Sequence, residues 1–225
     1  MNKQRISKPD YSNPNELSVS KIFFSIQGEG PFVGIPAVFI RLAGCNLMCP
    51  ACDTEYQEES ILTTEQIVDM IGMLYPTARL VVITGGEPFR QDISVLVYRL
   101  RAKNYIVQIE TNGTLCPAYV ENLDAFIVCS PKGRVNPGIF KKAFALKYVV
   151  SFDDIDRFDG LPNRALLGST RLSRPPEDYR GTIYLQPMDL GNASVNERNL
   201  QATIKSCMNF GYILCLQMHK IINME

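Results

Sequence analysis

The sequence predicts an α/β fold in which parallel strands and their connecting helices form an incomplete β/α barrel. Apolar, β-rich runs alternate with amphipathic segments, which favours a parallel sheet covered by helices. The runs end in polar or glycine-rich signatures such as TGGEP at 84–88 and ETNG at 110–113, and parallel barrels carry their active sites at the carboxyl ends of strands. Only about six strands have enough intervening sequence for crossover connections, so the barrel is expected to be partial. The expected strands cover residues 19–27, 36–44, 79–86, 105–113, 125–132, 146–152, 182–189 and 212–220.

Capping residues place the helices between these strands. Thr63 and Gln66 form a capping-box pattern, and Asp92 is placed to cap the next helix. Ser194, with Glu197 three residues later, opens the last helix, and a glycine at 211 closes it. The helices are expected over residues 66–74, 93–103 and 195–211.

Composition favours one domain that binds a small ligand. The 225 residues are 46% hydrophobic, which is enough for one substantial core. Lys and Arg together equal Asp and Glu at 23 each, so no excess charge indicates nucleic acid or an anionic membrane as a partner. The N-terminus lacks the apolar core of a signal peptide and no run of about 18 apolar residues occurs, so we expect a cytosolic, cytoplasmic protein.

We divide the chain into a mobile N-terminal tail at 1–17 and a single domain at 18–225. The tail is polar, with two prolines. Within the domain, 153–180 is the least regular region and is expected to be a loop with short helical pieces.

Three of the seven cysteines are clustered in the segment CNLMCPAC at 45–52. A cytosolic chain keeps its thiols reduced, and clustered cysteines in such a chain usually bind metal. A structural zinc site would need a fourth ligand, either Asp53 or His219. A four-iron cluster held by three thiolates would leave one iron open to bind and activate a ligand. The remaining cysteines lie in or beside apolar runs and are expected to pack as small hydrophobes: Cys116, Cys129, Cys207 and Cys215.

The spacing Cys45-x3-Cys49-x2-Cys52 resembles the cluster motif of the radical S-adenosylmethionine (SAM) superfamily, and TGGEP follows a later strand as it does there. The resemblance implies a partial barrel of the radical SAM type, a 4Fe-4S cluster on these cysteines and SAM as cofactor. Glycine suits the turn because a side chain at 85 or 86 would block the approach of the cofactor.

Within the superfamily, the chain resembles the 7-carboxy-7-deazaguanine synthase family over nearly its whole length after residue 18. The resemblance rests on FFSIQGEGPFVGIPAVFIRLAGCNLMCPACDTEY and on the later signatures VVITGGEP, QIETNGT, SPK, LQPMD and QMHK. It implies conversion of 6-carboxy-5,6,7,8-tetrahydropterin to 7-carboxy-7-deazaguanine with loss of ammonia, in queuosine or 7-deazapurine biosynthesis. It also implies Mg²⁺, a homodimer and an external electron donor such as flavodoxin or ferredoxin, with no nucleic-acid or membrane partner.

The resemblance assigns roles to particular residues. Thr54 would ligate Mg²⁺ through its hydroxyl, a hard oxygen ligand for a hard cation. As an alternative, Thr54 is a turn residue that caps its own loop, and Asp53 carries the same ambiguity. Without the motif around it, Lys132 would be interpreted as a solvated surface charge. The residues expected at SAM are Ala51, Cys52, Asp53, Gly86, Ser130, Pro131, Lys132, Gln186, Pro187, Met188 and Asp189.

Substrate contacts are expected from Ile26, Gln27, Gly28, Arg41 and Thr84. Arg41 interrupts an apolar strand, where an unpaired buried charge is very costly, so it must meet the substrate carboxylate, an internal ion pair or solvent at an edge.

Other polar residues near the expected site remain open. Glu29 is a weaker candidate for substrate contact. For Glu110 and Asn112 of ETNG the sequence leaves two roles open, hydrogen bonding at the barrel mouth or contact with a ligand. His219 is left without a catalytic role. Two rival functions remain, a glycyl-radical-enzyme activase of the same superfamily and a zinc-stabilised binding module.

Overall fold

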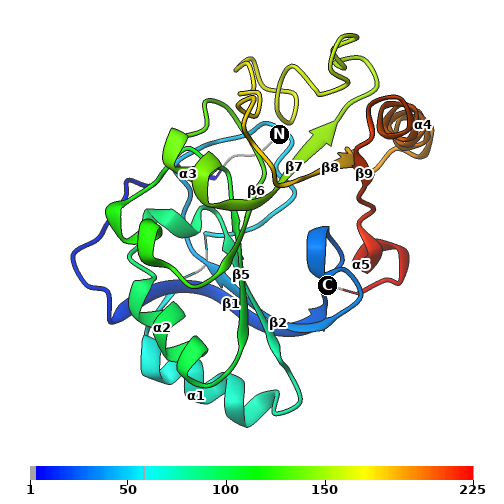
Figure 1. Cartoon of the computed structure of the whole chain (residues 1–225). Helices are drawn as coiled ribbons and strands as arrows, with labels where there is room; N and C mark the ends of the chain where they lie inside the picture. The colour runs from blue at the N-terminus through cyan, green and yellow to red at the C-terminus, as the bar shows by residue number, and fades with distance from the viewer. Residues whose placement is uncertain (1–3, 58, 225) are drawn as a thin grey trace.

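The chain folds around one curved, nine-stranded sheet that does not close into a complete barrel. The computed structural model describes residues 4–57 and 59–224, and the strands follow the order β3-β1-β2-β4-β5-β6-β7-β8-β9 (Figure 1). From β2 to β9 every neighbouring pair is parallel. The strands are β1 (Glu16–Ile26), β2 (Pro36–Leu42), β3 (Ser60–Thr63), β4 (Leu80–Gly85), β5 (Ile106–Thr111), β6 (Phe126–Cys129), β7 (Ala143–Val150), β8 (Thr182–Pro187) and β9 (Ile213–Leu214). The expected partial parallel β/α barrel is confirmed.

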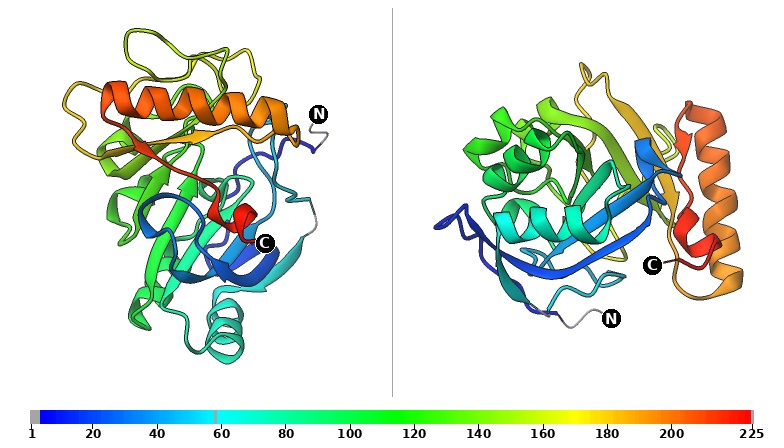
Figure 2. Two further views of the ribbon diagram at one scale, coloured as in Figure 1. Left: turned by 90° about the vertical axis from the view of Figure 1, so that its right-hand side faces the viewer. Right: turned by 90° about the horizontal axis from the view of Figure 1, so that it is seen from below.

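The helices α1 to α4 pack on the outer face of the sheet, whereas η1 and α5 lie on the side of the barrel interior (Figure 2). None of them, in the residues described, is long and apolar enough to cross a membrane. The α-helices are α1 (Thr64–Leu74), α2 (Ser94–Ala102), α3 (Pro137–Lys142), α4 (Ala193–Phe210) and α5 (Met218–Ile221), and the 3-10 helices are η1 (Gly30–Phe32), η2 (Pro88–Arg90) and η3 (Ala118–Asn122).

Alternation along the strands sorts side chains between the two faces. On β4, Val81 and Ile83 face the outer core, where they join Ile67 of α1 and Leu96 of α2. The other face of β4 points inward. Its lower residues Leu80 and Val82 pack with Ala37 and, from η1, with Phe32, while the last inward residue of β4 lines a cavity. The barrel is therefore apolar at its base and polar at its mouth.

β1 runs antiparallel to β2, because the connection between the two strands is too short for a parallel crossover. This agrees with the expectation that only about six strands are joined by crossovers. Other elements differ from the sequence prediction. The prediction of a strand at 212–220 is wrong over most of its length. β9 spans only two residues, and most of the QMHK signature lies in α5. Residues 153–180 contain turns and isolated bridges but none of the expected helical pieces.

The capping residues predicted for α1 are correct, whereas those predicted for the other helices are only partly correct. The Thr63–Gln66 capping box is present in full. Asp92 Oδ1 accepts a hydrogen bond from the backbone N–H of Ser94 at 3.0 Å. The cap of α4 is Asn192, not Ser194, because the Asn192 side chain accepts from Val195 N. The helix ends at a left-handed glycine, as predicted at 211.

The N-terminal segment lies against the barrel in its described part. Ser7 N donates to Cys45 O at 2.7 Å, and Asp10 N donates to Arg90 O at 2.8 Å. β1 begins at Glu16, two residues before the expected domain boundary. The division into a mobile tail at 1–17 and a domain at 18–225 stays a prediction, and residues 1–3 lie outside the described part of the chain.

Candidate active site

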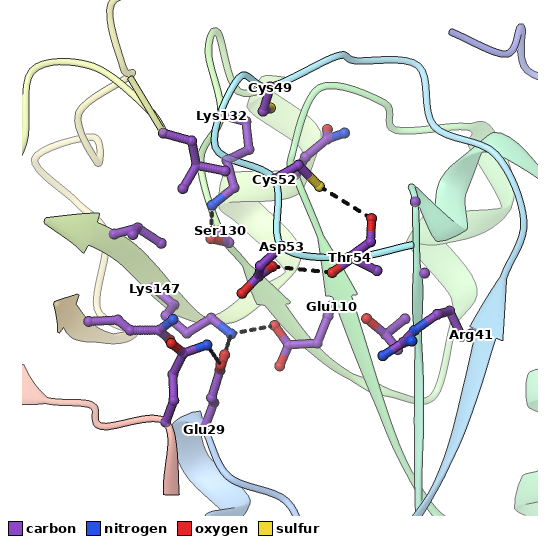
Figure 3. A pocket seen from close by; sticks show the side chains of 18 of the residues that line it. Glu29, Arg41, Cys49, Cys52, Asp53, Thr54, Glu110, Ser130, Lys132 and Lys147 are labelled. Carbon is purple, nitrogen blue, oxygen red and sulfur yellow. Dashed lines mark hydrogen bonds and ion pairs between the residues drawn. The ribbon is translucent and has the colours of Figure 1, made fainter. Parts of the chain in front are cut away.

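A cavity of about 400 Å³ opens at the carboxyl ends of the parallel strands (Figure 3). This volume falls in the range of small-molecule sites, roughly 300–1,000 Å³. Most of the site residues predicted from the sequence line it: Ile26, Gln27, Arg41, Cys45, Cys49, Ala51, Cys52, Asp53, Thr54, Thr84, Gly86, Ser130, Lys132, Gln186, Met188 and Asp189. Gly28, Pro131 and Pro187 do not line it.

Three predicted ligands for a cluster lie on the loop that follows β2. Cys45 is buried, whereas Cys49 and Cys52 are partly exposed. Burial raises the pKa of Cys45 to about 12 and raises that of the other two thiols, so binding a metal must displace protons from them. Among the described residues, no group of three or more His, Cys, Asp or Glu side chains is arranged to hold a metal ion. Three thiols spread around one cavity suit a larger, multi-iron group better than a single zinc ion.

The glycines of TGGEP pack against the start of this loop. A Cβ on Gly85 would lie 2.1 Å from Leu42 O, and a Cβ on Gly86 would lie 2.0 Å from Gly44 O and 2.8 Å from Cys45 Cβ. The contact is tied by backbone hydrogen bonds from Gly86 N to Leu42 O and from Glu87 N to Gly44 O. These glycines are therefore required by packing within the chain, in addition to the cofactor approach expected from the sequence.

The ETNG turn holds the same loop from the other side. Asn112 Nδ2 donates to Asn46 Oδ1 at 2.9 Å, and Asn46 Nδ2 donates to Thr114 Oγ1 at 2.8 Å. Glu87, fully buried, accepts from Asn112 N and from the Thr111 hydroxyl, both at 2.7 Å. Burial raises the pKa of this carboxyl to about 7. Asn112 thus supports the cysteine loop through side-chain hydrogen bonds.

Charged side chains ring the mouth of the cavity. Lys132 Nζ donates to Ser130 Oγ at 2.8 Å, and burial lowers its pKa. Lys220 of α5 bridges two of the predicted SAM residues, with its Nζ 2.9 Å from Asp189 Oδ2 and 3.5 Å from Asp53 Oδ2. The cysteine loop and the end of β8 are therefore linked through α5.

Arg41 lies on the inner face of β2, opposite Thr84 in the register with β4. Its guanidinium carbon is 5.1 Å from the centre of the Phe23 ring, and that ring stacks on Phe39 with centroids 5.1 Å apart. The cation is thus supported on an aromatic face while its side chain lines the cavity.

Thr54 and Asp53 lie side by side at the cavity. Thr54 Oγ1 donates to Asp53 Oδ1 at 3.3 Å, and both side chains line the cavity. Two hard oxygen atoms are thus available on one side of the site.

Lys147 was missed by sequence reasoning, and it joins two carboxylates, Glu29 and Glu110, that the sequence analysis left open. Lys147 contacts Glu29 and lies 3.1 Å from Glu110 Oε2, and all three side chains line the cavity. Gln217 Nε2 donates to Glu29 Oε1 at 2.9 Å. Lys147 lies within an apolar strand pattern, and its partners are far away in the sequence, so the residues alone gave no local signal.

The C-terminal segment forms part of the wall. Met218 N donates to Gly28 O at 3.0 Å, and His219 packs so closely that a Cβ on Gly28 would lie 2.2 Å from its Nδ1. His219 lines the cavity, and burial lowers its pKa. The absence of a side chain at Gly28 therefore allows the C-terminal segment to pack against it.

The other four cysteines have packing roles, as predicted. Cys129 and Cys207 belong to the main core, and Cys116 packs against it. Cys215 is buried and its sulfur accepts from Gly30 N at 3.2 Å.

The chain is similar to known proteins along most of its length. Residues 39–132 match the model of the Radical SAM superfamily. The 7-carboxy-7-deazaguanine synthase of Rhodospirillum rubrum is 38% identical over 225 residues, covering 95% of each chain. That of Rickettsia prowazekii is 36% identical over 222 residues, covering 93% of this chain and 89% of the relative. The crystal structure of QueE from Escherichia coli is 27% identical with a TM-score of 0.71, covering 91% of this chain and 95% of that chain.

A partial β/α barrel with three cysteines after its first parallel strand, matched by the superfamily model, defines a radical SAM protein. The similarity to individual relatives extends far beyond residues 39–132 and takes in nearly the whole chain. The chain belongs to the 7-carboxy-7-deazaguanine synthase family of this superfamily. The resemblance stated from the sequence is confirmed.

Proposed function

We propose that the protein is a 7-carboxy-7-deazaguanine synthase, which converts 6-carboxy-5,6,7,8-tetrahydropterin to 7-carboxy-7-deazaguanine with release of ammonia. The observation that carries the proposal is the division of one cavity between two kinds of side chain. The cysteine loop lies along one part of its wall, and Arg41 with the cluster of Glu29, Glu110 and Lys147 lies along another (Figure 3). A site of this kind is able to hold a redox group beside a polar substrate.

Three residues would hold the iron-sulfur cluster: Cys45, Cys49 and Cys52. When bound, the cluster supplies the electron that cleaves the sulfonium of SAM and releases a deoxyadenosyl radical. The loop that carries these thiols is fixed on two sides, by the glycine turn at 85–86 and by Asn112. Rigid ligands of this kind favour a constant cluster position.

SAM would lie between the cysteine loop and the ends of β6 and β8. Ser130, Lys132 and Gln186 line this part of the cavity, and Asp189 is held by Lys220. Lys132 is partly buried and hydrogen-bonded to Ser130, which supports a binding role over that of a solvated surface charge.

The substrate would lie toward Arg41. A guanidinium presents parallel N–H donors that match a carboxylate, and Arg41 is already ordered over Phe23. Gln27 is buried at the same cavity, where its Oε1 accepts from Glu29 N at 3.1 Å and its amide nitrogen would bind the pterin edge. Mg²⁺ would be ligated by Thr54, with Asp53 as its neighbour.

An anaerobic assay tests this function. The reconstituted protein is incubated with the carboxylated pterin, SAM, a reductant and Mg²⁺, and the products are identified by chromatography and mass spectrometry. We expect 7-carboxy-7-deazaguanine and one ammonia per turnover. Deoxyadenosine formed without any change in the pterin would contradict the proposal and favour the activase.

The rival functions predict different behaviour. A zinc-stabilised module would be colourless and would contain zinc after purification without oxygen, whereas an iron-sulfur protein is brown. The homodimer and the flavodoxin or ferredoxin donor stay predictions carried over from the family. The cytoplasmic location stays a prediction from the sequence.

A further inference from the structure

A buried lysine joins two carboxylates at the cavity wall. Lys147 is only 6% exposed, and its neighbours Leu146 and Tyr148 face the outer core. Lys147 therefore faces inward by the alternation of β7, into the cavity that it lines. A lysine in this position is costly unless it is paired, and its partners belong to two distant segments of the chain.

Each carboxylate is held at both oxygens. Lys147 Nζ contacts Glu29 Oε2 and lies 3.1 Å from Glu110 Oε2. The second oxygen of Glu29 accepts from Gln217, and the second oxygen of Glu110 accepts from Gln108. One cation and two amides thus fix the orientation of both carboxylates, and each oxygen keeps a further lone pair for a ligand.

The charges of this cluster do not balance. Two carboxylates and one ammonium leave a net charge of −1 beside the cavity. Burial alone would raise the pKa of Glu29, but Lys147 lowers it to about 2, whereas burial raises the pKa of Glu110 despite the same lysine. Removal of the ammonium would leave two like charges in close contact, and one carboxylate would then take up a proton.

We propose that Lys147 is a positioning residue that keeps Glu29 and Glu110 ionised side by side, as paired acceptors for N–H groups of the bound substrate. This role rests on the function proposed above, because a reduced pterin presents several N–H donors along its ring. Glu29 and Glu110 would bind those donors, and Arg41 would bind the carboxylate.

Three variants test the role of Lys147. Lys147→Met removes the charge and keeps an unbranched side chain, Lys147→Arg keeps the charge, and Lys205→Met on the exposed face of α4 is the matched control. We expect Lys147→Met to retain its iron and SAM affinity but to bind the carboxylated pterin about 10- to 100-fold more weakly at pH 7, the effect of losing a charge-assisted hydrogen bond. Arginine should restore much of the affinity, and the Lys205 variant should match wild type.

The pH dependence separates positioning from simple loss of packing. In Lys147→Met the deficit should shrink as pH rises from 6 to 9, because the shared proton leaves and both carboxylates become acceptors again. Other titratable groups near Lys147 are present in both proteins, so the measured quantity is the ratio of the two affinities at each pH. Those groups are Lys132, Cys215 and His219.

A measurement without substrate tests the role of Lys147 even if the proposed function is wrong. Glu87, whose pKa burial raises to about 7, should give a protonated carboxyl band in every variant in infrared difference spectra between pH 6 and pH 9. Lys147→Met should show an additional band of this kind that is absent from wild type and from Lys147→Met/Glu110→Gln. The double variant also has the wild-type net charge of −1 in this cluster, which helps if the single variant folds poorly. A deficit that does not change with pH, or the absence of the additional band, would overturn the role of Lys147. Absence of pterin turnover by wild type, with the additional band present in Lys147→Met, would overturn only the proposed function.

Discussion

Substituting alanine for Gly86 tests the contact that joins the glycine turn to the cysteine loop. The added Cβ would lie 2.0 Å from Gly44 O, whereas real Cβ atoms essentially never approach another heavy atom within 3.0 Å, so the two segments must separate by about 1 Å. Overpacking of this kind costs roughly 1–3 kcal/mol. Weakening the two backbone hydrogen bonds across the contact adds about 0.5–1.5 kcal/mol each.

The expected result is a loss of about 2–6 kcal/mol in the free energy of unfolding of the metal-free protein. For a chain of this size the melting temperature should fall by roughly 4–24 °C. Iron loading should also fall, because Cys45 lies in the segment that is displaced. The assay is thermal melting of the metal-free protein, followed by iron and sulfide analysis after reconstitution.

Gly72→Ala is the matched control for this prediction. Gly72 lies in the last turn of α1, is exposed, and has no neighbouring atom within 4 Å of an added Cβ. Alanine there should stabilise the protein by about 0.5–1 kcal/mol. If Gly86→Ala melts like wild type without metal and only binds SAM more weakly, the packing explanation is wrong. Gly86 would then serve only the approach of the cofactor.

Three further substitutions address the proposed ligands. Cys49→Ala should abolish cluster assembly, whereas Cys207→Ala, in the main core, should leave iron and sulfide content intact; full iron loading of the Cys49 variant would contradict the ligand assignment. Thr54→Val should keep SAM cleavage but weaken the response to Mg²⁺, and a titration identical to that of wild type would exclude ligation by the hydroxyl. Arg41→Lys should bind SAM normally and the carboxylated pterin about 10- to 100-fold more weakly; unchanged pterin affinity with a lowered melting temperature would assign Arg41 to an internal ion pair.

Features encoded over a few neighbouring residues were predictable. The strand ends were marked by glycine and polar residues, and the capping box needed only Thr63 and Gln66. Most of the predicted site residues line one cavity because parallel strands bring their carboxyl ends together.

Features that depend on distant residues were not predictable. The contact of Lys147 with Glu29 joins residues 118 positions apart, and LKYVVSF looks like an ordinary buried strand. The apolar run after α4 indicated a longer strand. It leaves the sheet after Leu214, and Met218 binds Gly28 while Gln217 binds Glu29. A hydrophobic pattern carries no information about such tertiary contacts.

The wall formed by Gln217, His219 and Lys220 has a consequence for how the protein is made. These residues come after every strand that the structure describes, while the cysteine loop precedes all of these strands except β1 and β2. During synthesis from the N-terminus the thiols therefore leave the ribosome long before the residues that close the cavity beside them. The site would therefore be open to iron and sulfide until the segment that follows β9 has been translated.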